Sequence, residues 1–374
     1  MLRVLQVVDR MDRAGQETFI MNVYRHLDRS SIQFDFVEFT DVPAAYDQEI
    51  LDLGGRIYRL PPKGRHLWAS MQAMRSLVAS QGYKIVHRHY SNSTMYFELL
   101  AAKQGGADCL IAHSHNSTQF NTKLLHQLCR NPLYRLTRWH LACSEDAGLW
   151  MFGNHPFDII PNGIDLERYH FDPQKRNAKR RELGLGQELL IGHVGRFTAV
   201  KNQAFILSVF QRFLELEPDA RLILVGEGED RADITRLSQS LPLTGHVIIP
   251  GSRADVPELM MAMDAFIMPS LYEGLPLTLV EAQAASLPCL VADTISPEAK
   301  LTDKLSYMSL QEGPQIWAVQ LRQLARQPRL DQTEAIRRAG YDIREVSQRL
   351  RYIYLNASGQ AADPVPPAGP PSRS

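Results

Sequence analysis

The segment "MDAFIMPSLYEGLPLTLVEAQAASLPCL", residues 263–290, contains the parts of a strand–helix–strand unit. The apolar runs "AFIM" and "PCLVA" have the length of buried strands. Between them, Pro276 suits the first turn of a helix. The apolar residues that follow recur on one helical face: Leu277, Val280, Ala284 and Leu287. We therefore predict a strand, a helix that begins near Pro276, and a second strand.

The same alternation extends along the chain. Apolar runs separated by helical stretches occur in both halves: "LRVLQVV", "FDFVEF", "RIYRL", "KIVHRHY", "CLIAHSH", "HLACS" and "FDIIPN", then "LLIGHVG", "RLILVG", "HVIIPG", "AFIMPS" and "PCLVAD". Strands that alternate with helices predict an α/β fold with parallel sheets covered on both faces. Because 374 residues are too many for one ordinary core, we expect two similar domains.

Changes in composition suggest where the domains end. We predict α/β domains at 1–165 and 188–340, joined by the polar and charged segment 166–187 as a linker. Residues 341–355 form a plausible last helix that returns toward the first domain. Residues 356–374 are rich in Pro, Gly, Ala and Ser, and we expect them to be disordered.

The composition narrows the class of protein. Lys plus Arg and Asp plus Glu both number 41, so no overall charge attracts nucleic acid or an anionic membrane. We see no secretory leader and no apolar run of the roughly 18 residues that a membrane span needs, and we expect a cytoplasmic protein. The four cysteines lack paired metal-ligand spacing and are typical of small core residues.

Ligands of open parallel sheets bind beyond the carboxyl ends of the strands, so the loops after the apolar runs are informative. After "AFIMPS", the backbone N–H groups of Gly274, Leu275 and Leu277 can hold a phosphate or a sugar oxygen at a helix start. Glu273 and Glu281 repel phosphate but accept hydrogen bonds from neutral hydroxyls on either side of it. The alternative is that both carboxylates only favour the helix dipole.

Two further loops carry candidate phosphate ligands. "LLIGHVGRFTAVKN" presents Arg196 and Lys201 between a strand and a helix, and together they can neutralise a diphosphate without a metal. Either residue alone would more often be a surface ion-pair partner. In "VVDRMDRAGQETF", Gly15 lies between a strand and a helix and can be only a turn glycine.

Histidines end two strands of the first half. "LIAHSHN" places His113 and His115 at a strand end, and "IVHRHYS" places His87 and His89 similarly. They can be satisfied core groups or polar ligands. Neither pair has a third Cys, His or carboxylate at metal-like spacing in the sequence, so we predict no metal and no other cofactor.

Taken together, these motifs resemble the retaining, two-domain glycosyltransferases of family 4. The resemblance covers residues 1 to about 355 and rests on "GRFTAVKN", "LVGEGE", "MDAFIMPSLYEGLPLTLVEAQAASLPCL", "GQETFIMNVYRHLDR", "IAHSHNS", "LACSEDAGLWMFG" and "IIPNGIDLERY". It implies the GT-B fold, in which two Rossmann-like domains face each other across a cleft. The N-terminal domain then takes the acceptor and the C-terminal domain the nucleotide-sugar. The chain is most similar to bacterial enzymes of exopolysaccharide, capsule and O-antigen synthesis.

The resemblance also implies a role for each matching residue. Arg196 and Lys201 bind the diphosphate, Glu281 the ribose hydroxyls and Glu273 the transferred sugar. The backbone of Gly274 and Leu275 holds sugar or phosphate oxygens, and Gly15 lies under the diphosphate from the opposite domain. His115 matches the histidine that contacts the donor sugar near the reaction centre, with His113 as the second choice. Ala14 replaces the more common first glycine of the Gly15 loop.

The implied reaction transfers a hexosyl or N-acetylhexosaminyl group with retention of the anomeric configuration. UDP-sugars are the first choice of donor and GDP-sugars the second, with a glycan or a polyprenyl-diphosphate-linked glycan as acceptor. A nucleotide-sugar epimerase or hydrolase, a non-catalytic sugar-nucleotide sensor and a Rossmann dehydrogenase are the alternatives. The dehydrogenase is the weakest, because "LVGEGE" does not open the first strand–helix unit.

One segment suggests where the acceptor is met. Residues 121–140, "NTKLLHQLCRNPLYRLTRWH", contain Lys123, Arg130, Arg135 and Arg138 among leucines and aromatics, with no acidic residue. Such a segment could bind the cytoplasmic face of the inner membrane peripherally. The alternative is a pair of amphipathic helices packed on the sheet with a solvated basic face.

Overall fold

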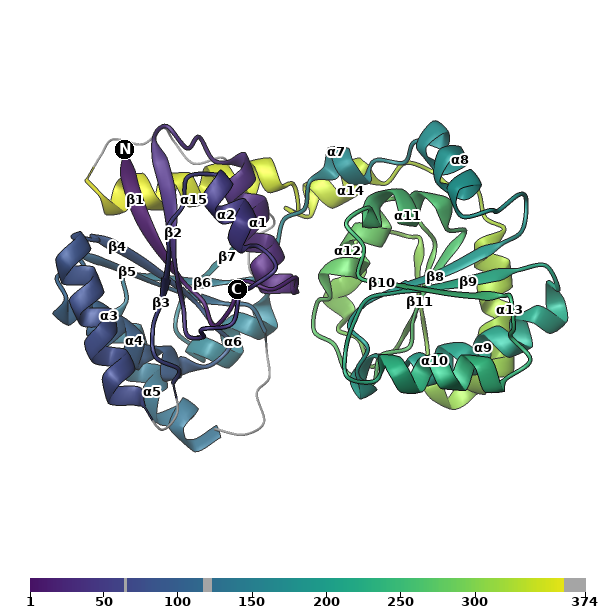
Figure 1. The fold of residues 1–374 in the computed structure, drawn as a ribbon, viewed down its shortest axis with the longest axis horizontal. Helices are drawn as coiled ribbons and strands as arrows, with labels where there is room; N and C mark the ends of the chain where they lie inside the picture. The colour runs from purple at the N-terminus through teal and green to yellow at the C-terminus, as the bar shows by residue number, and fades with distance from the viewer. Residues whose placement is uncertain (64–65, 117–122, 360–374) are drawn as a thin grey trace. The chain divides into compact units, whose positions relative to one another are not determined.

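The computed structural model describes residues 1–63, 66–116 and 123–359, and it divides the chain into two compact units. Unit 1 comprises Met1–Ile164 and the chain from Gly340 onward, and unit 2 comprises Asp165–Ala339. Each unit is built around one parallel sheet with helices on both faces (Figure 1). The predicted α/β class with two parallel-sheet domains is confirmed.

The sheet of unit 1 has the order β3-β2-β1-β4-β5-β6-β7. Its strands are β1 (Leu2–Val7), β2 (Ile32–Glu38), β3 (Ile57–Arg59), β4 (Ile85–His89), β5 (Cys109–Ser114), β6 (Trp139–Ala142) and β7 (Asp158–Ile159). Its helices are α1 (Gly15–His26), α2 (Asp47–Asp52), α3 (Leu67–Gln81), α4 (Tyr96–Gln104), α5 (Lys123–Leu136), α6 (Glu145–Phe152) and α15 (Ile343–Ala357), with a 3₁₀ turn at Ser93–Met95.

Side chains alternate between the two faces of this sheet. Val4 and Phe34 pack in a core with α1, α2 and α15, whereas Leu5 and Val37 pack with α3, α4, α5 and α6. This period of two is what a strand buried on both faces requires. Helix α15 packs against α1, so the last helix of the described chain completes unit 1.

The sheet of unit 2 has the order β10-β9-β8-β11-β12-β13. The strands are β8 (Leu190–Val194), β9 (Arg221–Val225), β10 (Val247–Gly251), β11 (Ala265–Met268), β12 (Cys289–Ala292) and β13 (Leu305–Met308). The helices are α7 (Leu166–Tyr169), α8 (Pro173–Glu182), α9 (Gln203–Leu216), α10 (Arg231–Ser240), α11 (Val256–Ala262), α12 (Leu277–Ala284), α13 (Gly313–Ala325) and α14 (Thr333–Arg338), with 3₁₀ turns at Ala199–Lys201, Pro297–Ala299 and Leu310–Glu312.

In each sheet the strand order reverses beside the first strand, between β1 and β4 and between β8 and β11. A crevice at the carboxyl ends of the strands is expected at such a point, and this is where open α/β sheets bind their ligands. The loops after β1, β4, β8 and β11 therefore contain the positions that matter for function.

The predicted linker, residues 166–187, is wrong. It forms α7 and α8, and both belong to unit 2. Its arginines bind the carbonyl groups at the carboxyl end of α11: Arg176 donates to Met261, Ala262 and Met263 at 2.8–3.0 Å, and Arg180 donates to Ala262 at 3.0 Å. The positive charge of this segment suggested a solvated connector. In the structure, its arginines bind the free carbonyl groups at the carboxyl end of α11, where the helix dipole is negative.

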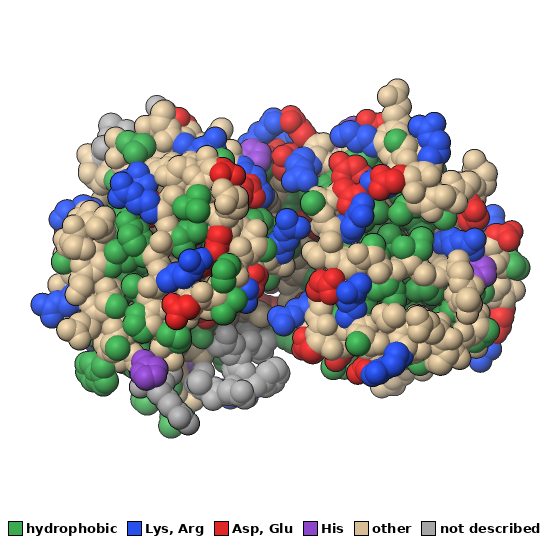
Figure 2. All heavy atoms as spheres, in the orientation of Figure 1, with side chains coloured by type: hydrophobic (Ala, Val, Ile, Leu, Met, Phe, Trp, Pro, Cys, Tyr) green, Lys and Arg blue, Asp and Glu red, His purple; other side chains and the backbone are tan. Residues whose placement is uncertain are grey.

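The predicted disordered tail, 356–374, begins too early, because α15 continues to Ala357. Residues 360–374 lie outside the described residues. No helix in the described part of the chain is both long enough and apolar enough to cross a bilayer. On the face shown in Figure 2, basic and acidic side chains are interspersed over both units.

Candidate active site

The loop after β8 is held against the loop after β9 by direct backbone contact. The Phe197 amide donates to the carbonyl of Glu227 at 2.9 Å. A Cβ on Gly226 would lie 2.0 Å from the Gly195 carbonyl oxygen, and one on Gly228 would lie 2.2 Å from that of Phe197. Only glycine permits this approach, which explains the "LVGEGE" turn.

A left-handed residue then directs the chain into α9. Asn202 has φ 56°, an uncommon conformation outside glycine, and its side chain donates to the Pro269 carbonyl at 3.2 Å. The one-turn 3₁₀ helix Ala199–Lys201 lies just before it. Lys201 is therefore fixed beside the loop that follows β11.

Lys201 and Glu273 form an ion pair at the carboxyl edge of the unit 2 sheet. Lys201 Nζ lies 2.5 Å from Glu273 Oε1, and the two side chains are only 15% and 19% exposed. The backbone of Glu273 is held as well, since its carbonyl accepts from the Ser296 amide at 3.1 Å. Two residues predicted from separate loops are thus brought into direct contact.

Arg196 lies in the same loop but differs in exposure. Its side chain is 74% exposed and lies 3.5 Å from Glu229, itself 62% exposed. An ion pair this exposed contributes little to stability, so the guanidinium can turn toward a bound anion at small cost. The structure therefore holds Lys201 in place and leaves Arg196 exposed on the surface.

Helix α12 begins at Leu277, directly after Pro276, near which its start was predicted. Glu281 lies one turn inside the helix. Pro276 precedes the helix in an extended conformation and offers no side-chain cap. The amide groups of Gly274 and Leu275 donate to no protein acceptor within the described residues. These two amides are therefore open to a ligand oxygen, and their binding of one stays a prediction.

Glu281 is buried, unlike an ordinary helix-surface carboxylate. Its side chain accepts a hydrogen bond from Tyr169 of α7. Burial raises the pKa of Glu281 to about 7, although the Tyr169 hydroxyl and the charge of Arg168 act in the opposite direction. The helix itself is buried on nearly all sides. A carboxyl held in this way is a positioned acceptor for hydroxyl groups, and helix-dipole balance alone does not explain its burial.

Two polar groups at this edge were missed by the sequence analysis. His193 on β8 is buried, donates from Nδ1 to the Ile267 carbonyl at 2.9 Å, and has no partner at Nε2. A Cβ at Gly195 would lie 3.1 Å from His193 Nε2 and 3.5 Å from Lys201 Cε, which places the imidazole near the lysine stem. Ser270, just after β11, has a buried and unpartnered hydroxyl. In the sequence, the histidine within "GHVG" was the feature that could have pointed to His193.

In unit 1, Gly15 is the first residue of α1. A Cβ at Gly15 would meet nothing within 4 Å, and its backbone is not left-handed, so neither packing nor conformation requires glycine. Ala14 caps the helix without a side-chain hydrogen bond. Glu17, which the sequence analysis did not select, lies in the first turn, where burial raises its pKa to about 7.

The predicted histidines lie at the carboxyl ends of neighbouring strands. His113 is fully buried, and its ring centroid lies 4.1 Å from that of His115. Both ring nitrogens of His115 are already hydrogen-bonded: Nδ1 lies 2.9 Å from Asn162 Oδ1 and Nε2 lies 2.8 Å from His89 Nδ1. Burial lowers the pKa of His115 to about 4, so the ring is neutral at pH 7. Its contact with a sugar stays a prediction, and a polar contact requires one of these hydrogen bonds to open.

The prediction of no metal rested on the spacing of histidines along the sequence, and the folded chain removes that reason. Each histidine pair lacks a third ligand along the sequence, but β4 and β5 are neighbours, with His89 beside His113. Ligating atoms of His87, His89 and His113 all lie within 4.8 Å of one another. The register between strands, which the sequence does not reveal, produces this group.

The predicted membrane segment is one helix, α5, followed by β6, and its residues 121–122 lie outside the described residues. Arg130 is engaged, because it donates to the Trp150 carbonyl at 2.9 Å. The other three basic residues are exposed: Lys123, Arg135 and Arg138. Leu124 and Leu128 are 72% and 64% exposed. The helix packs on the sheet through Leu133 and presents basic as well as apolar side chains to solvent. The packed, solvated basic face of the alternative is therefore present on one helix, and membrane contact stays a prediction.

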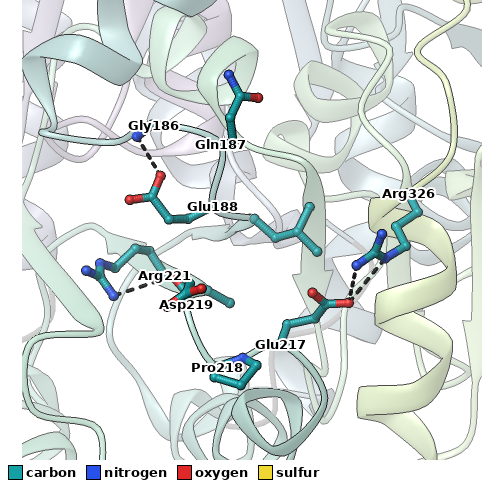
Figure 3. Close-up of a pocket in the computed structure, with 10 residues that line it drawn as sticks. Gly186, Gln187, Glu188, Glu217, Pro218, Asp219, Arg221 and Arg326 are labelled. Carbon is teal, nitrogen blue, oxygen red and sulfur yellow. Dashed lines mark hydrogen bonds and ion pairs between the residues drawn. The ribbon is translucent and has the colours of Figure 1, made fainter.

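A depression of about 510 Å³ lies at the opposite, amino end of the unit 2 sheet (Figure 3). It is lined by residues just before β8 and β9, among them Glu188, Glu217 and Arg221, and by Arg326. Glu217 accepts from Arg326 at 2.5 Å and from Arg322 at 2.6 Å, so its charge is neutralised within the protein. None of the predicted site residues lines it.

Two family models match the two halves of the chain. Residues 175–330 match the family model described as glycosyl transferases group 1, and residues 13–168 match the glycosyltransferase family 4 model. EpsF of Bacillus subtilis (strain 168), which is named as a glycosyltransferase, is 36% identical over 369 residues, covering 94% of this chain and 96% of EpsF.

Other similar proteins cover less of the chain or share only the fold. An Escherichia coli UDP-Gal:alpha-D-GlcNAc-diphosphoundecaprenol alpha-1,3-galactosyltransferase is 29% identical over 244 residues, which is 60% of this chain and 61% of that one. The structure of Anabaena HepE in complex with UDP-glucose superposes with a TM-score of 0.76 at 18% identity, covering 95% of this chain and all of that one. WaaG, a glycosyltransferase involved in lipopolysaccharide biosynthesis, gives 0.68 at 16% identity, covering 94% and 99%.

Proposed function

Because the chain belongs to the GT-B glycosyltransferases of group 1 and family 4, we propose that it transfers a sugar from a nucleotide-sugar, with a UDP-sugar as first choice, to a glycan or lipid-linked glycan. The transfer retains the anomeric configuration and serves the synthesis of a bacterial surface polysaccharide. The Lys201–Glu273 pair carries this proposal, because it joins a phosphate ligand to a hydroxyl acceptor at one sheet edge.

The donor sugar-nucleotide is recognised by three kinds of group in unit 2. Lys201 and Arg196 bind the diphosphate by charge-assisted hydrogen bonds. The free amides of Gly274 and Leu275 bind sugar or phosphate oxygens at the start of α12. Glu281 accepts hydrogen bonds from the ribose hydroxyls and Glu273 from the hydroxyls of the transferred sugar. No metal is needed for this step, because the two basic side chains supply the positive charge.

We propose direct displacement on the face from which the nucleotide leaves. The bond between the anomeric carbon and the diphosphate oxygen breaks, the acceptor oxygen bonds to that carbon, and the leaving phosphate takes the acceptor proton. Glu273 accepts hydrogen bonds from the transferred sugar in this proposal and does not act as a covalent nucleophile. Fixed positive charge at the departing diphosphate lowers the barrier.

The acceptor is taken by unit 1 in this proposal. The name of the Escherichia coli relative includes an undecaprenol-diphosphate-linked sugar, which supports a lipid-linked acceptor here. The exposed basic and leucine side chains of α5 support peripheral contact with an anionic membrane surface where such an acceptor resides.

The test is a panel of UDP- and GDP-sugars incubated with the purified protein, with and without a glycan acceptor. A donor that binds raises the melting temperature, and transfer is detected as an extended acceptor whose anomeric configuration is read by NMR. Conversion of the donor alone, without an acceptor product, would show an epimerase or a hydrolase. Binding without any conversion would show a sensor.

A further inference from the structure

Three histidines meet inside unit 1 where β4 and β5 pair. His87 and His89 come from β4 and His113 from β5, and their exposed fractions are 0%, 2% and 0%. One ligating nitrogen of each lies within 4.8 Å of the others, and this is the one such group of three among residues 1–63, 66–116 and 123–359. We propose that these three histidines bind a transition-metal ion, with Zn²⁺ as the expected metal.

The first support is a set of buried nitrogens without partners. Among the residues that the structure describes, neither ring nitrogen of His113 has a hydrogen-bond partner of normal geometry, and His87 Nε2 has none. The Ile160 carbonyl is near enough to His113 to raise its pKa slightly, but it makes no hydrogen bond of normal geometry with that ring. Buried polar atoms are almost always paired, so unpaired imidazole nitrogens within 4.8 Å of one another indicate a missing ligand.

The second support is the set of partners on the other side of the rings. His87 Nδ1 lies 2.7 Å from the Tyr354 hydroxyl, and His89 Nε2 lies 2.8 Å from Gln6 Oε1. Histidines that bind metals characteristically donate one ring N–H to an oxygen and present the other nitrogen to the ion. His87 Nε2 and His89 Nδ1 are then the ligating atoms, and binding releases His89 from its contact with His115.

The ligand set selects the class of metal. Three imidazoles without a carboxylate suit Zn²⁺, Cu²⁺ or Ni²⁺ and do not suit Mg²⁺ or Ca²⁺. Burial holds the pKa values of all three histidines well below their ordinary range, so the rings are neutral and no proton has to be displaced near pH 7. Tetrahedral coordination at about 2.0–2.1 Å places ligand nitrogens roughly 3.4 Å apart, so the nitrogens need to approach by at most ~1.4 Å. The rings of His87 and His113 are nearly parallel, with an interplanar angle of 5°, so at least one of them must also rotate to direct its nitrogen at the ion.

The metal would fasten β4 to β5 inside the core of unit 1. Zinc retention is measured without donor or acceptor, so loss of zinc binding and loss of sugar transfer are separate observations.

The experiment uses the full chain after removal of metal with EDTA. The protein is incubated or refolded with excess ZnSO₄, passed through a desalting column, and assayed for retained zinc and for melting temperature. We expect one equivalent of zinc and a raised melting temperature. His113→Phe, which keeps an aromatic ring but no ligand, should lose both. His155→Phe is the matched control, because His155 is an exposed histidine of unit 1 outside the group, and it should keep both.

Two results would overturn the proposal: no stoichiometric zinc on the wild-type protein, or one equivalent retained by a folded His113→Phe protein. If His113→Phe does not fold, X-ray absorption of the zinc-loaded wild type decides. The expected result is three nitrogen neighbours at about 2.0–2.1 Å with imidazole scattering, whereas a shell of oxygens shows adventitious surface zinc.

Discussion

Lys201 Nζ and Glu273 Oε1, which come from loops more than 70 residues apart, lie 2.5 Å from each other at the carboxyl edge of one sheet. In the protein without ligand, each charge neutralises the other. A donor diphosphate must compete with Glu273 for the lysine, while the sugar hydroxyls take over the carboxylate. Binding of the donor and opening of this pair are therefore a single event in our proposal.

Replacing Glu273 should separate binding from turnover. Glu273→Gln frees Lys201, so UDP without a sugar should bind equally well or more tightly, while transfer of the sugar should slow because its hydroxyls lose a charged acceptor. Calorimetric titration with UDP and steady-state transfer rates measure the two effects. Weaker UDP binding by Glu273→Gln would contradict the proposed competition.

Removing the lysine should weaken the donor site directly. Lys201→Ala should cost about 1.5–3 kcal/mol of donor binding through loss of a charge-assisted contact, and Arg196→Ala should cost less because its side chain is exposed. Transfer at subsaturating donor is the measurement. Arg212→Ala is the control, because Arg212 is an exposed, ion-paired residue of α9, and it should leave transfer unchanged.

The donor constant should depend on pH through Glu281. Its pKa of about 7 means that the carboxylate form, the better acceptor of ribose hydroxyls, is replaced by the protonated form as the pH falls from 8 to 6. We expect the apparent donor constant of the wild type to rise several-fold over this range relative to Glu281→Gln, which cannot titrate. Parallel pH profiles for the two proteins would exclude this role.

Stability should fall in mild acid because of the buried histidines. The pKa values of His87, His89 and His113 lie well below the unfolded value of about 6.5, and that of His115 is about 4. The unfolded chain therefore binds more protons below pH 6.5, so stability present above that pH is lost as the pH falls. Each such histidine can remove up to about 1.4 kcal/mol per pH unit, and Glu17 and Glu281, with pKa values of about 7, partly offset this loss.

Urea unfolding at pH 7 and pH 5, without added metal, measures this loss. His113→Phe should reduce the difference between the two pH values, and His155→Phe should not. Equal free energies of unfolding for the wild type at both pH values would contradict the assignment.

Contact of α5 with anionic membranes should depend on both kinds of exposed side chain. Replacing Lys123, Arg135 and Arg138 with alanine should reduce binding to anionic vesicles by about 1 kcal/mol for each residue, and Leu124→Ser with Leu128→Ser should reduce it further. Co-sedimentation at low and high salt measures binding. The control replaces three exposed basic residues of unit 2, Lys175, Arg181 and Arg212, and no difference between the two triple variants would exclude α5 as the contact.

Gly15→Ala separates a structural glycine from a functional one. Because an added Cβ meets nothing within 4 Å, the free energy of unfolding should be unchanged or higher by about 0.4–1 kcal/mol. Transfer should slow if the diphosphate lies over this loop. Full activity in Gly15→Ala would show that Gly15 is only a turn residue.

The strands were predictable because their signal is local. Each apolar run quoted from the sequence coincides with a strand, whereas β13 (Leu305–Met308) was missed, because Ser306 and Tyr307 make this edge strand less apolar. The linker was mispredicted because the contacts that decide its structure are not local in the sequence. Arg176 and Arg180 look solvated in the sequence, and only the fold shows the carbonyl groups that they bind.

The candidate site was predictable as a set of loops but not as a set of contacts. Lys201 and Glu273 were selected separately, and their pairing depends on the adjacency of β8 and β11. The burial of Glu281 depends on Tyr169, which lies in the segment expected to be a linker. The unpartnered Nε2 of His193 depends on the folded surroundings, so the histidine is visible in the sequence but its missing partner is not.

The position of α15 in unit 1 also fixes the order in which the protein can mature on the ribosome. Unit 2 is one continuous segment, Asp165–Ala339, and all of it is synthesised before α15. Unit 1 lacks Leu350, Ile353 and Tyr354 of its core until that last helix emerges. The unit that is begun first is therefore completed last, and one apolar face of its sheet lacks the cover of α15 until that helix has been made.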